Sequence, residues 1–173
     1  NVFRYNEYSN ISSLDPAFSS TLRNIWPCNQ IFNGLVKMDE KLNVVSDIAE
    51  KWSISEDKKT YIFKLRDDVY FHKSIFFRNN TRKVNAYDFE YSFNRILDQN
   101  IASPGAWVMN NVERFRALND SIFEIKLSNK FNSFIEILTM KYCSVVPKEV
   151  VQNLGDDFSK RPIGTGPFKF KRW

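Results

Sequence analysis

The fold is decided by one stretch, residues 31–72, which reads IFNGLVKMDEKLNVVSDIAEKWSISEDKKTYIFKLRDDVYFH. A tight turn containing a glycine opens it, and a short helical patch is expected to end at Trp52. After a polar turn, residues 60–66 alternate between two faces, one of which is made of Tyr61, Phe63 and Leu65. This alternation predicts a half-buried strand. The stretch contains no pair of nucleophile and base, so it is expected to be a scaffold.

Further elements are expected on both sides of this stretch. Residues 121–127 alternate in the same way and predict a strand that pairs antiparallel with 61–66. Asn85 can cap the strongest helix pattern of the chain, whose apolar stripe includes Phe89 and Phe93. The other expected elements are strands over 2–5 and 142–146, a hairpin of 35–38 and 42–45, helices over 131–140 and 147–151, and a helix capped by Ser19 or Ser20 and kinked or restarted at Pro27. This order predicts a mixed α/β (α+β) fold in which helices flank a mixed or antiparallel sheet.

Composition places the chain among globular proteins. It has 173 residues, with 16 Phe, 7 Tyr and 4 Trp against only 5 Gly. Such a chain is long enough to bury a core, and its aromatic content excludes a disordered chain. No apolar run reaches the length of a transmembrane helix, and no signal sequence is recognised, so a mature or trimmed start is expected.

The formal net charge is +5, and along the sequence Lys and Arg are interleaved with Asp and Glu. The densest basic run, Arg78 to Lys83, is expected to be a solvated loop. Nucleic-acid binding needs positive charge gathered on one face, which this pattern does not predict. We therefore expect no nucleic-acid partner.

The chain offers few candidates for catalysis or metal binding. Cys28 and Cys143 match no metal spacing; one disulfide and two free buried thiols are both compatible with them, and free thiols are favoured. His72 is the single histidine and has no fixed Ser or Cys partner in the sequence. Asp67 and Asp68 lack a third ligand and are expected to form a turn. We expect no catalytic residue, no metal site, no cofactor and no enzyme activity.

Five motifs occur in one order along the chain. They are Leu14-Asp15-Pro16, the pattern GL…D…AE.W..S.D..TY.F.LR..V.FH within residues 34–72, Ala86–Phe93 with Arg95, Val146-Pro147-Lys148, and Pro162–Phe168 leading to Trp173. Together they resemble family 5 of the extracytoplasmic solute-binding proteins of ABC importers. The importers of this family take up oligopeptides, dipeptides, nickel and related solutes. The GTGP motif at 164–167 lacks the lysine of a phosphate loop and is expected to be a turn between subdomains.

The resemblance implies a periplasmic-binding-protein-like fold, in which two α/β lobes close on a ligand. It implies that residues 1–45 are the first segment of lobe I, 46–160 the additional small subdomain of the peptide-binding cluster, and 161–173 the return strand toward lobe I, with the second lobe absent from this chain. The implied function is extracytoplasmic binding of oligo- or dipeptides for uptake. Alternatives are a peptide sensor or chaperone-like binder without transport, and binding of nickel or a metal chelate.

The partners implied by the resemblance are a peptide or other small-molecule ligand and the transmembrane subunits of an ABC permease. The implied location is periplasmic or otherwise extracytoplasmic. Membrane association is expected only through a lipid anchor, as in a lipoprotein, and that anchor is absent from this chain.

The resemblance also implies ligand-binding residues at two places, with one further contact. The turn that matches the cleft-facing turn of the family consists of Phe32, Asn33, Gly34 and Leu35. Residues 102–105 then present Trp107 on a loop similar to a cleft-lining loop of the oligopeptide-binding branch; the alternative is that Trp107 plugs the core. Tyr142 is the further contact. Peptide-binding relatives commonly have Glu where this chain has Asn33, and Asn offers a dipole without the charge that would receive an ammonium group.

Overall fold

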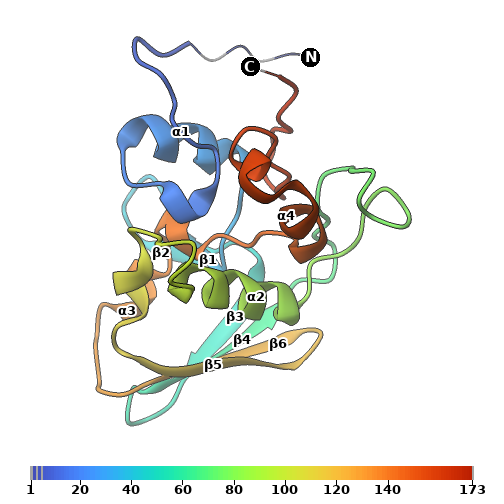
Figure 1. Ribbon diagram of the computed structural model, residues 1–173. Coiled ribbons are helices and arrows are strands. Elements are labelled where there is room, and N and C mark those ends of the chain that lie inside the picture. The colour runs from blue at the N-terminus through green and yellow to red at the C-terminus, as the bar shows by residue number, and fades with distance from the viewer. Residues whose placement is uncertain (1, 3, 5, 173) are drawn as a thin grey trace.

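The computed structural model describes residues 2, 4 and 6–172, so the strand expected over 2–5 and the end of the last motif at Trp173 lie partly or wholly outside the described residues. A four-stranded antiparallel sheet in the order β3-β4-β6-β5 forms one layer of the molecule (Figure 1). Its strands are β3 (Ala49–Ile54), β4 (Thr60–Leu65), β5 (Val112–Asn119) and β6 (Ile122–Leu127).

The central strands β4 and β6 confirm the predicted antiparallel pairing. Tyr61 lies opposite Ile125, and Phe63 lies opposite Phe123. All four side chains are buried. The alternation in sequence is the cause, because a strand that buries one face places every second residue in the core.

Helix α2 (Ala86–Leu97) covers the apolar face of this sheet (Figure 1). Phe93 packs edge-on against Phe123 of β6, with ring centroids 5.5 Å apart. The predicted cap is confirmed: the Asn85 side chain accepts a hydrogen bond from the Asp88 N–H, and the Asp88 carboxylate accepts one from the Asn85 N–H. This reciprocal arrangement fixes the residue at which the helix begins.

Arg82 ties the start of α2 to the helix α4 (Lys148–Leu154), which confirms the helix predicted at that place. Its guanidinium donates hydrogen bonds to the carboxylates of Asp88 and Glu149. The same guanidinium lies 5.0 Å from the ring centroid of Phe71. One cation therefore joins Phe71 and the start of α2 to α4, whose Glu149 lies 67 residues further along the chain than Arg82.

The N-terminal helix α1 (Leu22–Ile31) differs from prediction at its start. It begins after Thr21, whose side chain makes no capping hydrogen bond, so the cap predicted at Ser19 or Ser20 is wrong. Pro27 lies inside the helix, which does not restart there. Proline removes one backbone donor, and here a single missing bond does not end the helix.

A two-stranded hairpin follows α1 and confirms the one predicted. Its strands β1 (Val36–Met38) and β2 (Val44–Ser46) pair antiparallel. The Asp39 carboxylate closes the loop between them by accepting hydrogen bonds from the N–H groups of Lys41 and Asn43. Such a local side-chain bond to the backbone is typical of turns.

Three other expectations were wrong. The patch expected to be helical up to Trp52 is strand β3, because its backbone pairs with β4. The helix expected over 131–140 is shortened to α3 (Phe134–Ile137). The strand expected over 142–146 is replaced by the short helix η3 (Lys141–Cys143) and extended residues that belong to neither sheet. Contacts with other segments overrode local propensity in the first and third cases, because β3 pairs with β4 and the Val145 N–H donates to the Asn33 carbonyl.

The remaining elements are three 3-10 helices that lie between the larger ones. They are η1 (Pro16–Phe18), η2 (Ala106–Met109) and η4 (Gly155–Ser159). Both cysteines are buried and free, as predicted, with Cys28 on α1 and Cys143 on η3. Burial raises the pKa of each thiol to about 12.

Residues 161–172 return to the end of α1. The Gly166 N–H donates a hydrogen bond to the Ile31 carbonyl. A Cβ atom on Gly164 would lie 2.1 Å from the Ile31 oxygen, and one on Gly166 would lie 2.4 Å from the Gln30 oxygen. The GTGP motif is therefore a close backbone crossing over the end of α1, which only glycine permits at these two positions.

Candidate functional site

The turn at Asn33 and Gly34 is held by side chains from two distant segments. The Asn33 amide donates to both carboxylate oxygens of Asp47, at 2.9 and 3.1 Å. The Thr165 hydroxyl donates to Asn33 Oδ1 at 2.9 Å. The Gly34 N–H also donates to Asp47, at 3.2 Å. The polar groups of this turn are thus largely bonded within the protein.

Asp47 supplies a negative charge directly behind this turn. Its side chain is buried, and the Lys37 ammonium lies 3.8 Å from Asp47 Oδ1. Burial lowers the pKa of Lys141, while the charge of Asp47 opposes that shift. The Asp47 carboxylate therefore lies among hydrogen-bond donors and cations of the protein. Its hydrogen bonds with Asn33 and Gly34 stabilise the turn.

Residues 138–145 pack against this turn. A Cβ atom on Gly34 would lie 3.4 Å from the Cys143 carbonyl oxygen, which is ordinary contact. The Val145 N–H donates a hydrogen bond to the Asn33 carbonyl at 3.0 Å. The turn and residues 138–145 consequently form one packed unit.

The loop that carries Trp107 packs against the same residues. Tyr142 lies so close to Gly105 that a Cβ atom there would be 2.2 Å from Tyr142 Cδ1. The buried Ser103 hydroxyl donates to the Ala17 carbonyl at 2.6 Å and accepts from the Gly105 N–H at 3.1 Å. The sequence-predicted positions are therefore brought together around residues 138–145.

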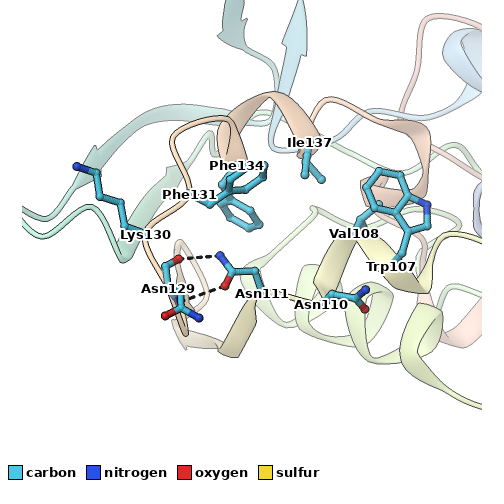
Figure 2. A pocket seen from close by; sticks show the side chains of 9 residues that line it. All are labelled: Trp107, Val108, Asn110, Asn111, Asn129, Lys130, Phe131, Phe134 and Ile137. Atoms are coloured by element: carbon cyan, nitrogen blue, oxygen red, sulfur yellow. Dashed lines mark hydrogen bonds between the residues drawn. The ribbon is translucent and has the colours of Figure 1, made fainter.

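Trp107 lies on η2, and 47 % of its surface is exposed. It forms one wall of a cavity of about 420 Å³ that is lined by Trp107, Val108, Asn110, Asn111, Asn129, Lys130, Phe131, Phe134 and Ile137. Figure 2 shows Trp107 and Val108 on one side of this cavity and Phe131, Phe134 and Ile137 on the other. Since nearly half of the indole is open to solvent, Trp107 does not fill the core.

The polar residues of this cavity divide into two kinds. The Asn111 amide is used internally: it donates to the Asn129 carbonyl at 2.7 Å and accepts from the Asn129 N–H at 3.1 Å, as Figure 2 shows. Asn110 and Lys130 are exposed at the rim. The lining contains no carboxylate, so it offers apolar surface, amide dipoles and one positive charge.

The six residues predicted for the ligand site differ in what they present. The side chains of Phe32 and Leu35 are buried, and Phe32 packs against Phe158 with ring centroids 6.3 Å apart. Tyr142 is also buried and supports Gly105, and its pKa is raised by burial. Of the six, Trp107 is the most exposed to solvent.

Most of the cavity lining was missed by sequence reasoning. Phe131, Phe134 and Ile137 were assigned to an apolar helix, and their spacing alone did not distinguish a core face from a cavity wall. Asn110, Asn111 and Asn129 gave no motif at all. The sequence did contain one signal of an exposed aromatic residue, because Phe131 directly follows the polar residues 128–130. The structure shows that Phe131 is exposed.

Within residues 2, 4 and 6–172, no three His, Cys, Asp or Glu side chains gather into a group able to hold a metal ion. His72 Nε2–H donates to the Gly166 carbonyl at 2.7 Å, and burial lowers the pKa of the ring. This histidine therefore holds the GTGP crossing in place. No helix of the described part of the chain combines the length and apolarity needed to cross a bilayer.

Comparison with known proteins relates these features to a family. The profile of the bacterial extracellular solute-binding proteins, family 5 (Middle), matches residues 43–173. A di/tripeptide-binding protein of Pseudomonas aeruginosa is 31 % identical over 160 residues, covering 83 % of this chain. The match covers 30 % of that relative, so this chain spans about a third of its length.

Solved structures agree with this assignment. The periplasmic binding protein DppA of Helicobacter pylori, in complex with the peptide STSA, aligns with a TM-score of 0.84 at 28 % identity, over 94 % of this chain and 35 % of that one. NikZ of Campylobacter jejuni, in complex with Ni(L-His), aligns with a TM-score of 0.80 at 28 % identity, over 95 % and 32 %. The profile match, the sequence identity and the structural alignments lead to one conclusion: the chain belongs to the bacterial extracellular solute-binding proteins of family 5.

Proposed function

We propose that this chain is part of an extracytoplasmic peptide-binding protein that delivers oligo- or dipeptides to an ABC permease, without a catalytic step. Within it, residues 1–45 and 161–173 belong to lobe I and residues 46–160 to the additional subdomain. The hydrogen bond between Gly166 and Ile31, from the two ends of the chain, supports this division. The location is extracytoplasmic, with a lipid anchor as one means of holding the protein at the membrane.

One observation carries the proposal: residues 138–145 hold the Asn33–Gly34 turn and the Trp107 loop together. The Val145 N–H donates a hydrogen bond to the Asn33 carbonyl of the turn. Gly105 of the Trp107 loop packs against the Tyr142 ring. A binding protein needs contact groups at fixed positions, because groups that must be ordered on binding reduce the affinity. Trp107 then presents a large, partly exposed aromatic surface from a fixed loop.

The chemistry of the exposed lining suits a peptide. An aromatic wall and apolar residues accept side chains of varied shape, and the amide of Asn110 at the rim can exchange hydrogen bonds with a peptide backbone. Asn33 contributes less than its position in the family suggests. Its amide hydrogens are used by Asp47, so it has at most an Oδ1 lone pair to offer a ligand.

The test is calorimetric titration of the complete protein with di- and tripeptides. Trp107→Ala is expected to weaken peptide binding about 30-fold, because truncating a central aromatic contact removes about 2 kcal/mol. Trp26→Ala is the matched control, since Trp26 is also exposed but lies on α1. Equal affinities of wild type and Trp107→Ala would remove Trp107 from the site, and binding of a nickel chelate but no peptide would overturn the peptide assignment.

A further inference from the structure

Two segments of the chain contain many basic residues and no acidic ones. Residues 69–87 and 158–172 together hold nine of the 25 Lys and Arg and none of the 20 Asp and Glu. The rest of the chain therefore carries a net charge of −4, although the whole chain carries +5. Along the sequence this asymmetry is hidden, because 70 residues separate the two segments.

The structure brings these two segments side by side. The His72 N–H donates to the Gly164 carbonyl at 2.8 Å, and the Lys169 ammonium donates to the Lys73 carbonyl at 2.6 Å. A groove of about 280 Å³ runs between them, lined by Lys73, Ser74, Ile75, Phe76, Leu154, Arg161, Pro162, Ile163, Phe170 and Lys171. We name the surface formed by both segments the basic face.

Most of the charge on the basic face is open to a partner. Lys73, Arg78, Arg161 and Lys171 are exposed, and no ion pair within the described part of the chain involves their side chains. Arg82, by contrast, is neutralised by Asp88 and Glu149. The groove lining contains no carboxylate.

An apolar tip accompanies these charges. Ile75 is 84 % exposed and lies midway along the loop, residues 66–85, that leads from β4 to α2. Figure 1 shows this loop, in green, projecting from the body on the side of α4. In water, a branched aliphatic side chain on a projecting loop is not stabilised by burial of its apolar surface. It can be buried by insertion between lipid headgroups, while the surrounding cations contact the lipid phosphates.

We propose that the basic face docks on an anionic membrane surface, with Ile75 inserted and Lys73, Arg161 and Lys171 against acidic headgroups. Charge complementarity selects an anionic partner. The exposed Ile75 side chain can neither stack on a base nor bond to a phosphate, but it can enter a bilayer, so it favours a lipid surface over a nucleic acid. Such docking would bring the protein close to the permease independently of the Trp107 site.

The test is co-sedimentation of the complete protein with vesicles of phosphatidylcholine alone or mixed with phosphatidylglycerol. We expect binding to the mixed vesicles only, and its loss at high salt. The triple variant Lys73→Gln, Arg161→Gln, Lys171→Gln is expected to bind about 100-fold more weakly, at about fivefold per charge removed. Ile75→Ser is expected to weaken binding about tenfold.

The matched control is Lys41→Gln, Lys51→Gln, Lys58→Gln, which removes the same charge from exposed positions outside the basic face. Thermal unfolding of each variant establishes that it is folded. The proposal is overturned if the complete protein does not bind the mixed vesicles, or if the two triple variants lose vesicle binding to the same extent. Preferential binding of a DNA duplex over lipid would also overturn it.

Discussion

The close contact between Gly105 and Tyr142 makes a specific prediction about the Trp107 loop. A Cβ atom on Gly105 would lie 2.2 Å from Tyr142 Cδ1, 2.3 Å from Cγ and 2.9 Å from Cβ. Carbon atoms in contact normally stay about 3.5–4.0 Å apart, so Gly105→Ala must displace the ring or the loop by more than about 1 Å. Because Tyr142 is buried, a shift of its ring must also displace the residues packed around it.

We expect Gly105→Ala to destabilise the protein by about 1–3 kcal/mol, the range for overpacking a well-packed site. In a unit of 173 residues, 2 kcal/mol lowers the melting temperature by about 4–8 °C, and in a longer protein that unfolds as one unit the shift is smaller. The displaced loop carries Trp107, so peptide affinity is expected to fall as well, although no contact residue has changed.

The assays are thermal unfolding followed by circular dichroism and calorimetric peptide titration, both on the complete protein. Gly105→Ala is compared with Gly155→Ala, where an added Cβ meets nothing within 4 Å and the cost comes only from a φ of +52°. The double variant Gly105→Ala, Tyr142→Ala is expected to be more stable than the sum of the single effects predicts, since removing the ring relieves the clash. Unchanged stability and affinity in Gly105→Ala, or strictly additive effects, would refute this reasoning.

Three further predictions follow from other contacts. Arg82→Ala leaves Asp88 buried without its cation and is expected to cost about 3–5 kcal/mol in denaturant unfolding; a cost below 1 kcal/mol would contradict the role of Arg82 as a joint. Burial lowers the pKa of His72 below its usual 6.5, so the unfolded state binds the proton more tightly; the free energy of unfolding should fall as pH drops below about 6.5, and less steeply in His72→Gln. Cys28 and Cys143, with pKa raised to about 12, should react with a thiol reagent at pH 8 only after denaturation, and fast reaction of the folded protein would contradict their burial.

The parts of the fold that could be predicted are those where local and long-range signals agree. Residues 60–65 alternate and also pair with a second alternating strand, so β4 and β6 were both found. Asn85 caps α2 through a local contact three residues away, which sequence shows directly. β3 was mistaken for a helix because Ala, Glu and Lys favour helices, and only its pairing with β4 makes these residues a strand.

The arrangement of the site could not be predicted from residue patterns, because it depends on contacts between distant segments. The bond between Asn33 and Thr165 joins residues 132 positions apart. The resemblance to a family drew attention to Asn33, Trp107 and Tyr142, but it did not show that Tyr142 packs on Gly105. The basic face was missed for the same reason: charges interleaved along a chain are gathered on one face only once the chain is folded.

The central claim is that the Trp107 loop forms a wall of the ligand cleft, and fluorine NMR tests it most directly. The four tryptophans of the chain can be labelled with 5-fluorotryptophan in the complete protein, and Trp107→Phe and Trp26→Phe assign two of their resonances. Addition of a tripeptide is expected to shift the Trp107 resonance and leave that of Trp26 in place, because only the first lies on the wall. A bound tripeptide that leaves the Trp107 resonance unmoved would contradict the account.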